Sequence, residues 1–159
     1  MITETELVLD KTDLHILRLM QENARMSNAD LARELGMAPS GVLERVKKLE
    51  QKNVLQQYTA RINPVVLGQK MLAFIFIKVS DGPGCDTTAR QLAEIPEVQE
   101  VHHIAGEDCY LVKVRTYDSS TLMSLMRGKF SKLPNLLSTR TTIVLETVKE
   151  QQLLVIPEN

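Results

Sequence analysis

A helix-sized stretch with a basic outer face is the part of this sequence best suited to binding a polyanion. Between Pro39 and Lys52 there are four basic and two acidic residues. A helix turns by about 100° per residue, so Val42, Val46 and Leu49 fall on one side. The opposite side then carries Ser40, Gly41, Glu44, Lys47 and Lys48. Such a helix fits the major groove of B-DNA, where lysines neutralise phosphates and Ser40 and Glu44 can reach base edges. We therefore expect this helix to bind double-stranded DNA.

A solvated helix face is the alternative interpretation of the same stretch. Glu44 and Lys48 would then form an i,i+4 ion pair, which is worth only ~0.3–0.5 kcal/mol. Arg45 borders the apolar side, so we interpret it first as a salt-bridge donor inside the protein, and we keep it among the candidate DNA-binding residues. Because folds of this kind also serve as protein-docking modules, the alternative stays open.

Two further helices are predicted to position the basic one. Asp10 can cap a first helix, with Asp13 at the third position favouring the helix dipole. Ser27 can cap a second helix, with Asp30 three residues later. A backbone phosphate could dock at the N-terminus of this second helix, at Ser27 and Asn28.

The junction between the second and third helices is tight. Gly36 supplies the left-handed residue that ends the second helix, and Pro39 suits the first position of the third. Three helices with a glycine turn between the last two predict a helix-turn-helix. Residues 54–62 are expected to follow it as one or two extended stretches.

The second half of the chain has strand-like alternation. Strands are predicted at 72–79, 98–104, 109–117 and 136–148, helices at 85–95 and at 119–133 with Ser119 as cap, and turns at 81–84 and 105–108. This order is the ferredoxin-like βαββαβ plan, so the fold class is α+β.

The expected domain organisation follows from these elements. We assign 1–62 to a winged helix-turn-helix DNA-binding domain, 63–70 to a linker, 71–150 to the ferredoxin-like domain and 151–159 to a C-terminal tail. Asn63-Pro64 and Gly68 mark the linker because both are turn signals.

The segment "HHIAGEDCYLVKV", from His102 to Val114, carries the second candidate site. Gly106 allows a ligand to approach the backbone closely. The unpaired N–H groups of a turn suit a carboxylate, and Glu107 or Asp108 could accept an ammonium group. An α-amino acid has both groups. The alternative is a plain hairpin turn. The candidate ligand-binding residues of this loop are Ala105, Gly106, Glu107, Asp108 and Cys109.

Other chemistry finds little support in the sequence. His102 and His103 are adjacent on a strand, so they point to opposite faces and do not chelate one metal. There is no nucleophile-elbow motif and no phosphate-binding loop. We therefore predict no metal, no cofactor and no enzymatic activity.

Composition points to a cytoplasmic protein that does not enter membranes. No apolar run approaches the roughly 20 residues of a spanning helix, and the acidic N-terminus does not resemble a signal peptide. Cys85 and Cys109 are best interpreted as reduced thiols, with a regulatory disulfide as the alternative. The net charge of −1 gives no global attraction to nucleic acid, so a dimer would matter by doubling the basic patch.

The chain resembles a known family. The stretch "LDKTDLHILRLMQENARMSNADLARELGMAPSGVLERVKKLEQKNVLQQYTA" is similar to the N-terminal domain of the Lrp/AsnC (feast/famine) transcriptional regulators. The second half resembles the effector domain of that family, in "AGED", in "LP" before the last strand and in "TRTTIVLETVK". The resemblance implies an amino-acid effector bound near subunit interfaces of a homodimer or a higher oligomer of dimers. It also adds Thr139 and Thr141 to the candidate effector-binding residues.

Three positions depart from the family pattern. Ala38 stands where a capping serine is usual, and Asn53 replaces a glycine but tolerates the left-handed conformation. Cys109 stands where an aspartate often follows the glycine loop, and a thiol is a weak acceptor. We expect Asp108 or Glu107 to compensate; otherwise the amino acid would bind weakly or not at all.

Two other functions remain as alternatives. One is a ligand-independent architectural DNA-binding protein. The other is an enzyme, because haem-precursor decarboxylases resemble this fold and His102 and His103 lie in the comparable strand region. The lysines of the predicted recognition helix argue against the enzyme.

Overall fold

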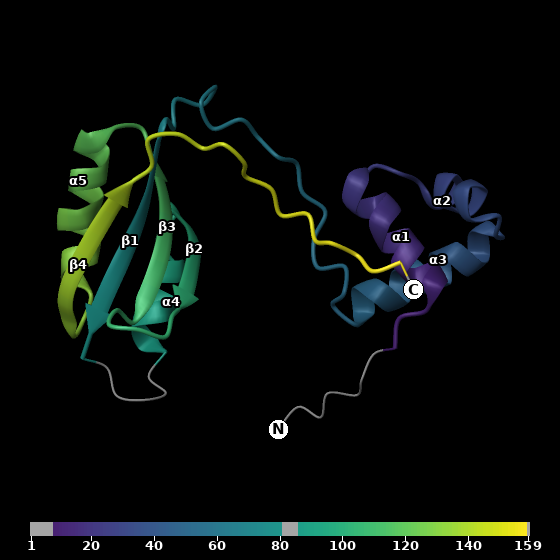
Figure 1. The fold of residues 1–159 in the computed structure, drawn as a ribbon, viewed down its shortest axis with the longest axis horizontal. Helices are drawn as coiled ribbons and strands as arrows, with labels where there is room; N and C mark the ends of the chain where they lie inside the picture. The colour runs from purple at the N-terminus through teal and green to yellow at the C-terminus, as the bar shows by residue number, and fades with distance from the viewer. Residues whose placement is uncertain (1–7, 81–85, 159) are drawn as a thin grey trace. The chain divides into compact units, whose positions relative to one another are not determined.

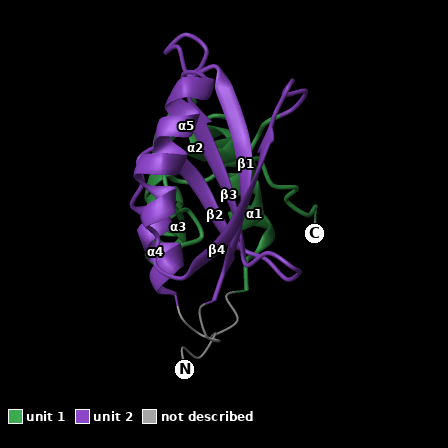
Figure 2. Cartoon of the chain, turned by 90° about the vertical axis from the view of Figure 1, so that its left-hand side faces the viewer, with its two compact units in different colours: residues 1–61, 150–159 green, residues 62–149 purple. Residues whose placement is uncertain are grey.

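The structure, a computed structural model, describes residues 8–80 and 86–158. It divides into two compact units, Met1–Arg61 with Glu150–Asn159, and Ile62–Lys149 (Figure 2). The predicted linker 63–70 thus begins the second unit, and the predicted tail joins the first. None of the described helices is long and apolar enough to cross a membrane.

The first unit is a bundle of three helices, α1 (Lys11–Glu22), α2 (Asn28–Leu35) and α3 (Pro39–Gln51) (Figure 1). Capping boxes at Asp10 and Ser27 start α1 and α2 as predicted. Gly36 ends α2 with φ +63°, and Asn53 follows α3 with φ +56°. The predicted helix-turn-helix is therefore confirmed, together with the left-handed conformation of Asn53.

One hydrophobic cluster holds these helices together. It contains Ile16, Met20, Leu31, Ala32, Val42, Val46 and Leu49, all buried. Every helix contributes to this cluster, so the position of α3 is fixed by packing against both α1 and α2.

The extended stretches predicted at 54–62 do not form strands in the described part of the chain. Val54 and Leu55 donate backbone hydrogen bonds to Leu49 and so close the end of α3. A strand is defined by a hydrogen-bonded neighbour, and these residues have none among the described strands.

The second unit has the predicted ferredoxin-like order. Its elements are β1 (Met71–Val79), α4 (Thr87–Ala93), β2 (Val98–His103), β3 (Tyr110–Thr116), α5 (Ser119–Gly128), the 3₁₀ turn η1 (Phe130–Lys132) and β4 (Leu136–Ile143). The sheet order is β2-β3-β1-β4, and all neighbours are antiparallel. The predicted turn at 81–84 and Cys85 lie outside the described residues.

The last helix differs from the prediction at both ends. Asp118, not Ser119, is the N-cap of α5, because its carboxylate accepts from the Thr121 N–H at 2.7 Å. The helix ends at Gly128, which has low helix propensity, and the 3₁₀ turn that follows buries Phe130 completely.

The last strand is shorter than predicted. It ends at Ile143 rather than at residue 148. Its only described neighbour is β1, where Ala73 pairs with Ile143 and Leu72 accepts from the Val144 N–H. Because β1 begins at Met71, the chain beyond Val144 has no strand left to pair with.

The two faces of this sheet differ. Helices α4 and α5 cover one face, over Ile75, Ile77, Val112 and Val114, which are all completely buried (Figure 2). The opposite face, which we call the open face, alternates with these residues. It carries Phe74 and Phe76 of β1, Leu111 of β3 and Arg140 of β4, none of them fully buried.

Candidate DNA-binding surface and effector loop

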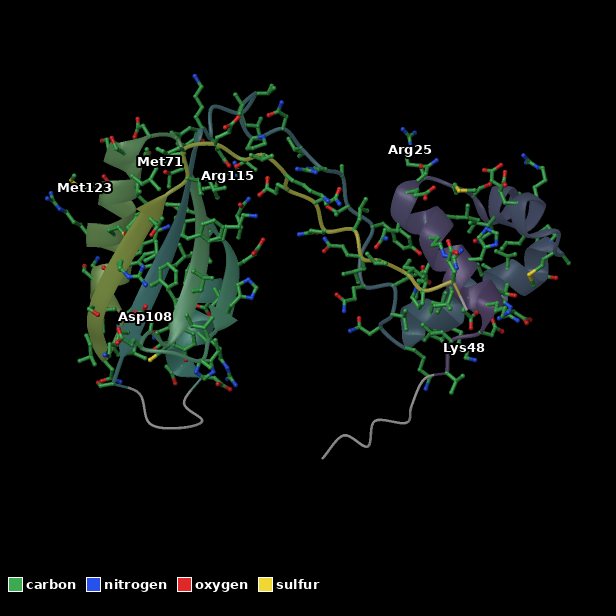
Figure 3. The ribbon with its side chains drawn as sticks, viewed as in Figure 1. Arg25, Lys48, Met71, Asp108, Arg115 and Met123 are labelled. Atoms are coloured by element: carbon green, nitrogen blue, oxygen red, sulfur yellow. The ribbon has the colours of Figure 1, made fainter. Side chains whose placement is uncertain are left out.

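The predicted recognition helix, α3, has one buried and one exposed side. Val42, Val46 and Leu49 are 0%, 5% and 2% exposed. The exposed side carries Ser40, Glu44, Lys47 and Lys48, with Pro39 exposed at its start and Gly41 half-buried. Lys48 extends from α3 in Figure 3. Except for Arg45, the predicted contact residues of this helix therefore lie together on one accessible face.

Arg45 is held inside the first unit. Its NH1 group lies 2.7 Å from an Asp10 carboxylate oxygen and 2.8 Å from one of Asp13. The pKa of Asp10 is held below its ordinary value, first by the hydrogen bond from the Asp13 N–H and next by that from Arg45. Arg45 thus ties α3 to the capping box of α1, as we expected of an internal salt-bridge donor.

The N-terminus of α2 is occupied by its own cap. The Ser27 hydroxyl donates to Asp30 at 2.6 Å and accepts from the Asp30 N–H at 3.1 Å. The pKa of Asp30 is lowered, chiefly by the hydrogen bond from the Ser27 side chain. A phosphate docking at Ser27 and the half-buried Asn28 would therefore meet a carboxylate. At the start of α3, Ala38 makes no side-chain cap, as predicted.

The candidate effector loop closes β2 onto β3. The Ile104 N–H donates to the Cys109 carbonyl, and the Cys109 N–H donates to the Ile77 carbonyl, both at 2.9 Å. Ala105, Gly106 and Glu107 are exposed between these bonds, and Gly106 has φ +156°. The loop therefore lies at the end of the sheet where β1 ends, with Asp108 labelled there in Figure 3.

Asp108 and Cys109 are already engaged. An Asp108 carboxylate oxygen lies 3.0 Å from NH2 of Arg140, whose guanidinium carbon lies 4.0 Å from the centre of the Phe76 ring. The Cys109 thiol is half-buried and lies 3.6 Å from the Val79 carbonyl. An ammonium group at Asp108 would thus have to compete with Arg140.

The structure brings the loop and β4 to the same end of the sheet, but on different faces. Thr139 pairs with Ile77 and Thr141 with Ile75, so both threonines share the helix-covered face, where they remain exposed. Arg140, between them, turns to the open face. Sequence analysis missed Arg140 as a member of this site, although strand alternation beside Thr139 and Thr141 was available as a signal.

The two histidines make separate contacts. His102 lies 3.2 Å from Glu100, and the His103 ring packs against Tyr110 with centroids 5.2 Å apart. Among the described residues, no group of three or more His, Cys, Asp or Glu could hold a metal ion.

A cavity of about 590 Å³ lies at the opposite end of the sheet, where β3 ends. The predicted site residues do not line it. Polar groups of its lining pair with one another: Lys129 lies 2.7 Å from Glu97, and Arg115 donates to Gln99 at 3.3 Å. Lys129 is the main reason why the pKa of Glu97 is lowered. Several polar side chains that line the cavity therefore already have hydrogen-bond partners within the lining.

Comparison with known proteins gives two family matches. Residues 72–154 match the model described as "Lrp/AsnC ligand binding domain", and residues 9–56 match "Winged helix-turn-helix DNA-binding". The leucine-responsive regulatory protein of Escherichia coli K12 is 35% identical over 150 residues, covering 93% of this chain and 92% of that protein.

Solved structures agree with these matches. The feast or famine regulatory protein of Mycobacterium tuberculosis in complex with L-methionine is 33% identical, with a TM-score of 0.85, and covers 94% of this chain and all of that one. A transcriptional regulator of Neisseria meningitidis in complex with L-methionine is 27% identical with the same TM-score, covering 93% and 97%.

Arg45→Met tests the role assigned to Arg45. We expect the free energy of unfolding to fall by about 1–2 kcal/mol at neutral pH, because Asp13 loses a charged partner where it is buried. The folded-state pKa of Asp10 is depressed, so its part of this stability is present above the ordinary value of 3.8 and is lost as the pH falls through the lower folded value. Urea denaturation as a function of pH measures this.

The matched control for this experiment is Arg33→Met. Arg33 pairs with Asp30 at 3.0 Å, but its side chain is 76% exposed. We expect a change within about 0.5 kcal/mol. Equal effects of the two substitutions would contradict the positioning role of Arg45.

Proposed function

Because the chain belongs to the Lrp/AsnC family of transcriptional regulators, we propose that it is a sequence-specific DNA-binding regulator whose DNA binding or assembly responds to a small effector, an amino acid. DNA binding is supported by one observation, the exposed basic face of α3 opposite the buried side chains of Val42, Val46 and Leu49. The helix would enter the major groove, with Lys47 and Lys48 on phosphates and Ser40 and Glu44 towards base edges. In this proposal the protein acts in the cytoplasm and catalyses no reaction.

An amino-acid effector is supported by the relatives and by the loop. Two of the similar structures hold L-methionine. In this chain the exposed backbone of Ala105–Glu107 would bind the carboxylate, and Asp108 or Glu107 the ammonium group. The proposed site also includes Thr139 and Thr141, which lie at the same end of the sheet but on its helix-covered face. An architectural DNA-binding protein without an effector is the alternative that a ligand titration distinguishes.

We further propose a homodimer, or an oligomer of dimers, built on the open face. Antiparallel sheets can expose one face to water, but that face is then polar. Here it carries Phe74, Phe76 and Leu111, which no described helix covers. A second copy would bury them, and it would supply the two recognition helices that read half-sites about one helical turn apart.

Replacing Lys47 and Lys48 with alanine tests the DNA-binding face. We expect weaker binding to all DNA sequences and a shallower dependence of log Kd on log salt, by about one unit for each lost phosphate contact. Fluorescence anisotropy at several salt concentrations measures both. The control is the double replacement of Lys132 and Lys149, which are also exposed and change the net charge equally. If the two double variants behave alike, the effect is one of global charge and the assigned face is wrong.

Leu111→Asp tests assembly through the open face. We expect the wild type to sediment as a dimer or a multiple of dimers. The dissociation constant of the variant should be at least about tenfold higher, because a carboxylate would be buried at the interface. Analytical ultracentrifugation gives the dissociation constants. Val66→Asp is the control, because Val66 precedes β1 and its side chain is 79% exposed. A monomeric wild type at micromolar concentration would contradict the proposed dimer.

Arg140→Gln and Gly106→Val test the effector loop. If Asp108 compensates for Cys109, removal of its competitor Arg140 should tighten amino-acid binding severalfold, whereas Gly106→Val should abolish it by blocking the approach to the backbone. Calorimetric titration with leucine, methionine, asparagine and lysine measures this, with Arg90→Gln as control. If the wild type binds no amino acid and Cys109→Asp does, Asp108 and Glu107 do not compensate for Cys109. If all variants bind amino acids with equal affinity, the site lies elsewhere.

A further inference from the structure

The C-terminal tail is bound to helix α1 through its main chain. The Gln21 side-chain amide donates to the Leu154 carbonyl at 2.7 Å, and its oxygen accepts from the Leu154 N–H at 2.8 Å. One amide group thus pairs with both polar groups of one residue, as a neighbouring strand would. The two residues are 133 positions apart in the sequence, so this contact closes a very long loop.

Two more contacts hold the same segment. NH2 of Arg18 donates to the Pro157 carbonyl at 3.0 Å. At the start of the tail, Glu150 lies 3.7 Å from Arg61, and both residues belong to the first unit. The tail is therefore held at its beginning, middle and end.

Apolar burial contributes little to this binding. Leu153, Leu154 and Val155 are 51%, 75% and 99% exposed. Of the aliphatic tail residues, Ile156 alone is half-buried. Hydrogen bonds therefore do more than packed side chains to hold the tail, and Gln21 of α1 makes two of the four polar contacts described above.

The tail connects directly to the strand that carries the proposed effector residues. Strand β4 contains Thr139 and Thr141 and ends at Ile143, and six residues, 144–149, lead to the tail. Fully extended, six residues span about 20 Å. The other connection between the units enters β1 at Met71, and Ala73 pairs with Ile143. Both connections thus leave the sheet at the same end, on neighbouring strands.

We propose that the bound tail is a second tether through which the state of β4 reaches the DNA-binding unit, with Gln21 as the residue that positions it. A single linker leaves two units free to reorient, which is the ordinary expectation for units with separate cores. Two short connections from neighbouring strands restrict that freedom while the tail is bound. This proposal rests on the proposed function, since the state of β4 that it transmits is set by the effector.

Hydrogen–deuterium exchange of the full-length protein tests the binding of the tail. In the wild type the Leu154 amide should be protected, and Gln21→Ala should raise its exchange rate on the order of tenfold, because two hydrogen bonds are lost. Gln152→Ala is the matched control, the same substitution at an exposed tail residue, and should exchange like the wild type. A Leu154 amide that exchanges at the unprotected rate in the wild type overturns the proposal.

Ligand titration tests the transmission. For wild type and Gln21→Ala, DNA affinity is measured with and without saturating methionine or leucine. We expect Gln21→Ala to bind DNA without ligand within about twofold of wild type, and to lose most of the ligand-induced change. A full ligand-induced change in Gln21→Ala, despite a freely exchanging tail, overturns the tether.

The failure of the proposed function is distinguishable from the failure of the tether. If the wild type binds no DNA, the proposed function fails, and the tether is judged by whether methionine or leucine changes the exchange of residues 150–158. If the amino acid changes the exchange rate of the tail and Gln21→Ala abolishes that change, the tether is supported. If the amino acid leaves the exchange rate unchanged, the tether is overturned.

Discussion

Burial of one side of α3 is the constraint on which the DNA-binding unit depends. Burying an aliphatic side chain contributes about 1.5–3 kcal/mol, and α3 buries Val42, Val46 and Leu49. A surface ion pair contributes about 0–1 kcal/mol. The rotation of α3 about its axis is therefore set by burial, and the lysines face outward as a consequence. Arg45, at the border of the two sides, adds a polar tie to α1 that burial alone would not supply.

In the second unit, the central position of β1 has the corresponding role. It pairs with β3 on one side and with β4 on the other. Its alternation sends Ile75 and Ile77 towards the helices and Phe76 to the open face, where Arg140 covers it. The same alternation divides β4 between Thr139 and Thr141 on one face and Arg140 on the other. In the proposed site, a ligand at the loop would therefore act on the open face through Asp108, which links the loop to Arg140.

Most of the local architecture could be predicted from the sequence because its determinants are local. The capping boxes at Asp10 and Ser27 span four residues each, and the left-handed turn at Gly36 needs one. What could not be predicted depends on partners far along the chain. The end of β4 is set by where β1 begins, and Asp108 meets Arg140 across 32 residues. Whether the stretch 54–62 pairs as a strand also could not be predicted, since a strand requires a hydrogen-bonded partner that the local sequence does not reveal.

The strength of the contacts between the tail and α1 suits a regulator better than a rigid scaffold. Among the described residues each unit has its own hydrophobic cluster, and in this proposal the signal travels through the connections between the units. Coupling free energies in allosteric proteins are typically about 1–3 kcal/mol. A net contribution of about 0.5–1.5 kcal/mol for each hydrogen bond gives the pair between Gln21 and Leu154 the same magnitude. A tail buried by several leucines would be bound too tightly for an effector to shift it. The exposure of Leu154 and Val155 leaves the binding of the tail within the range that ligand binding can change.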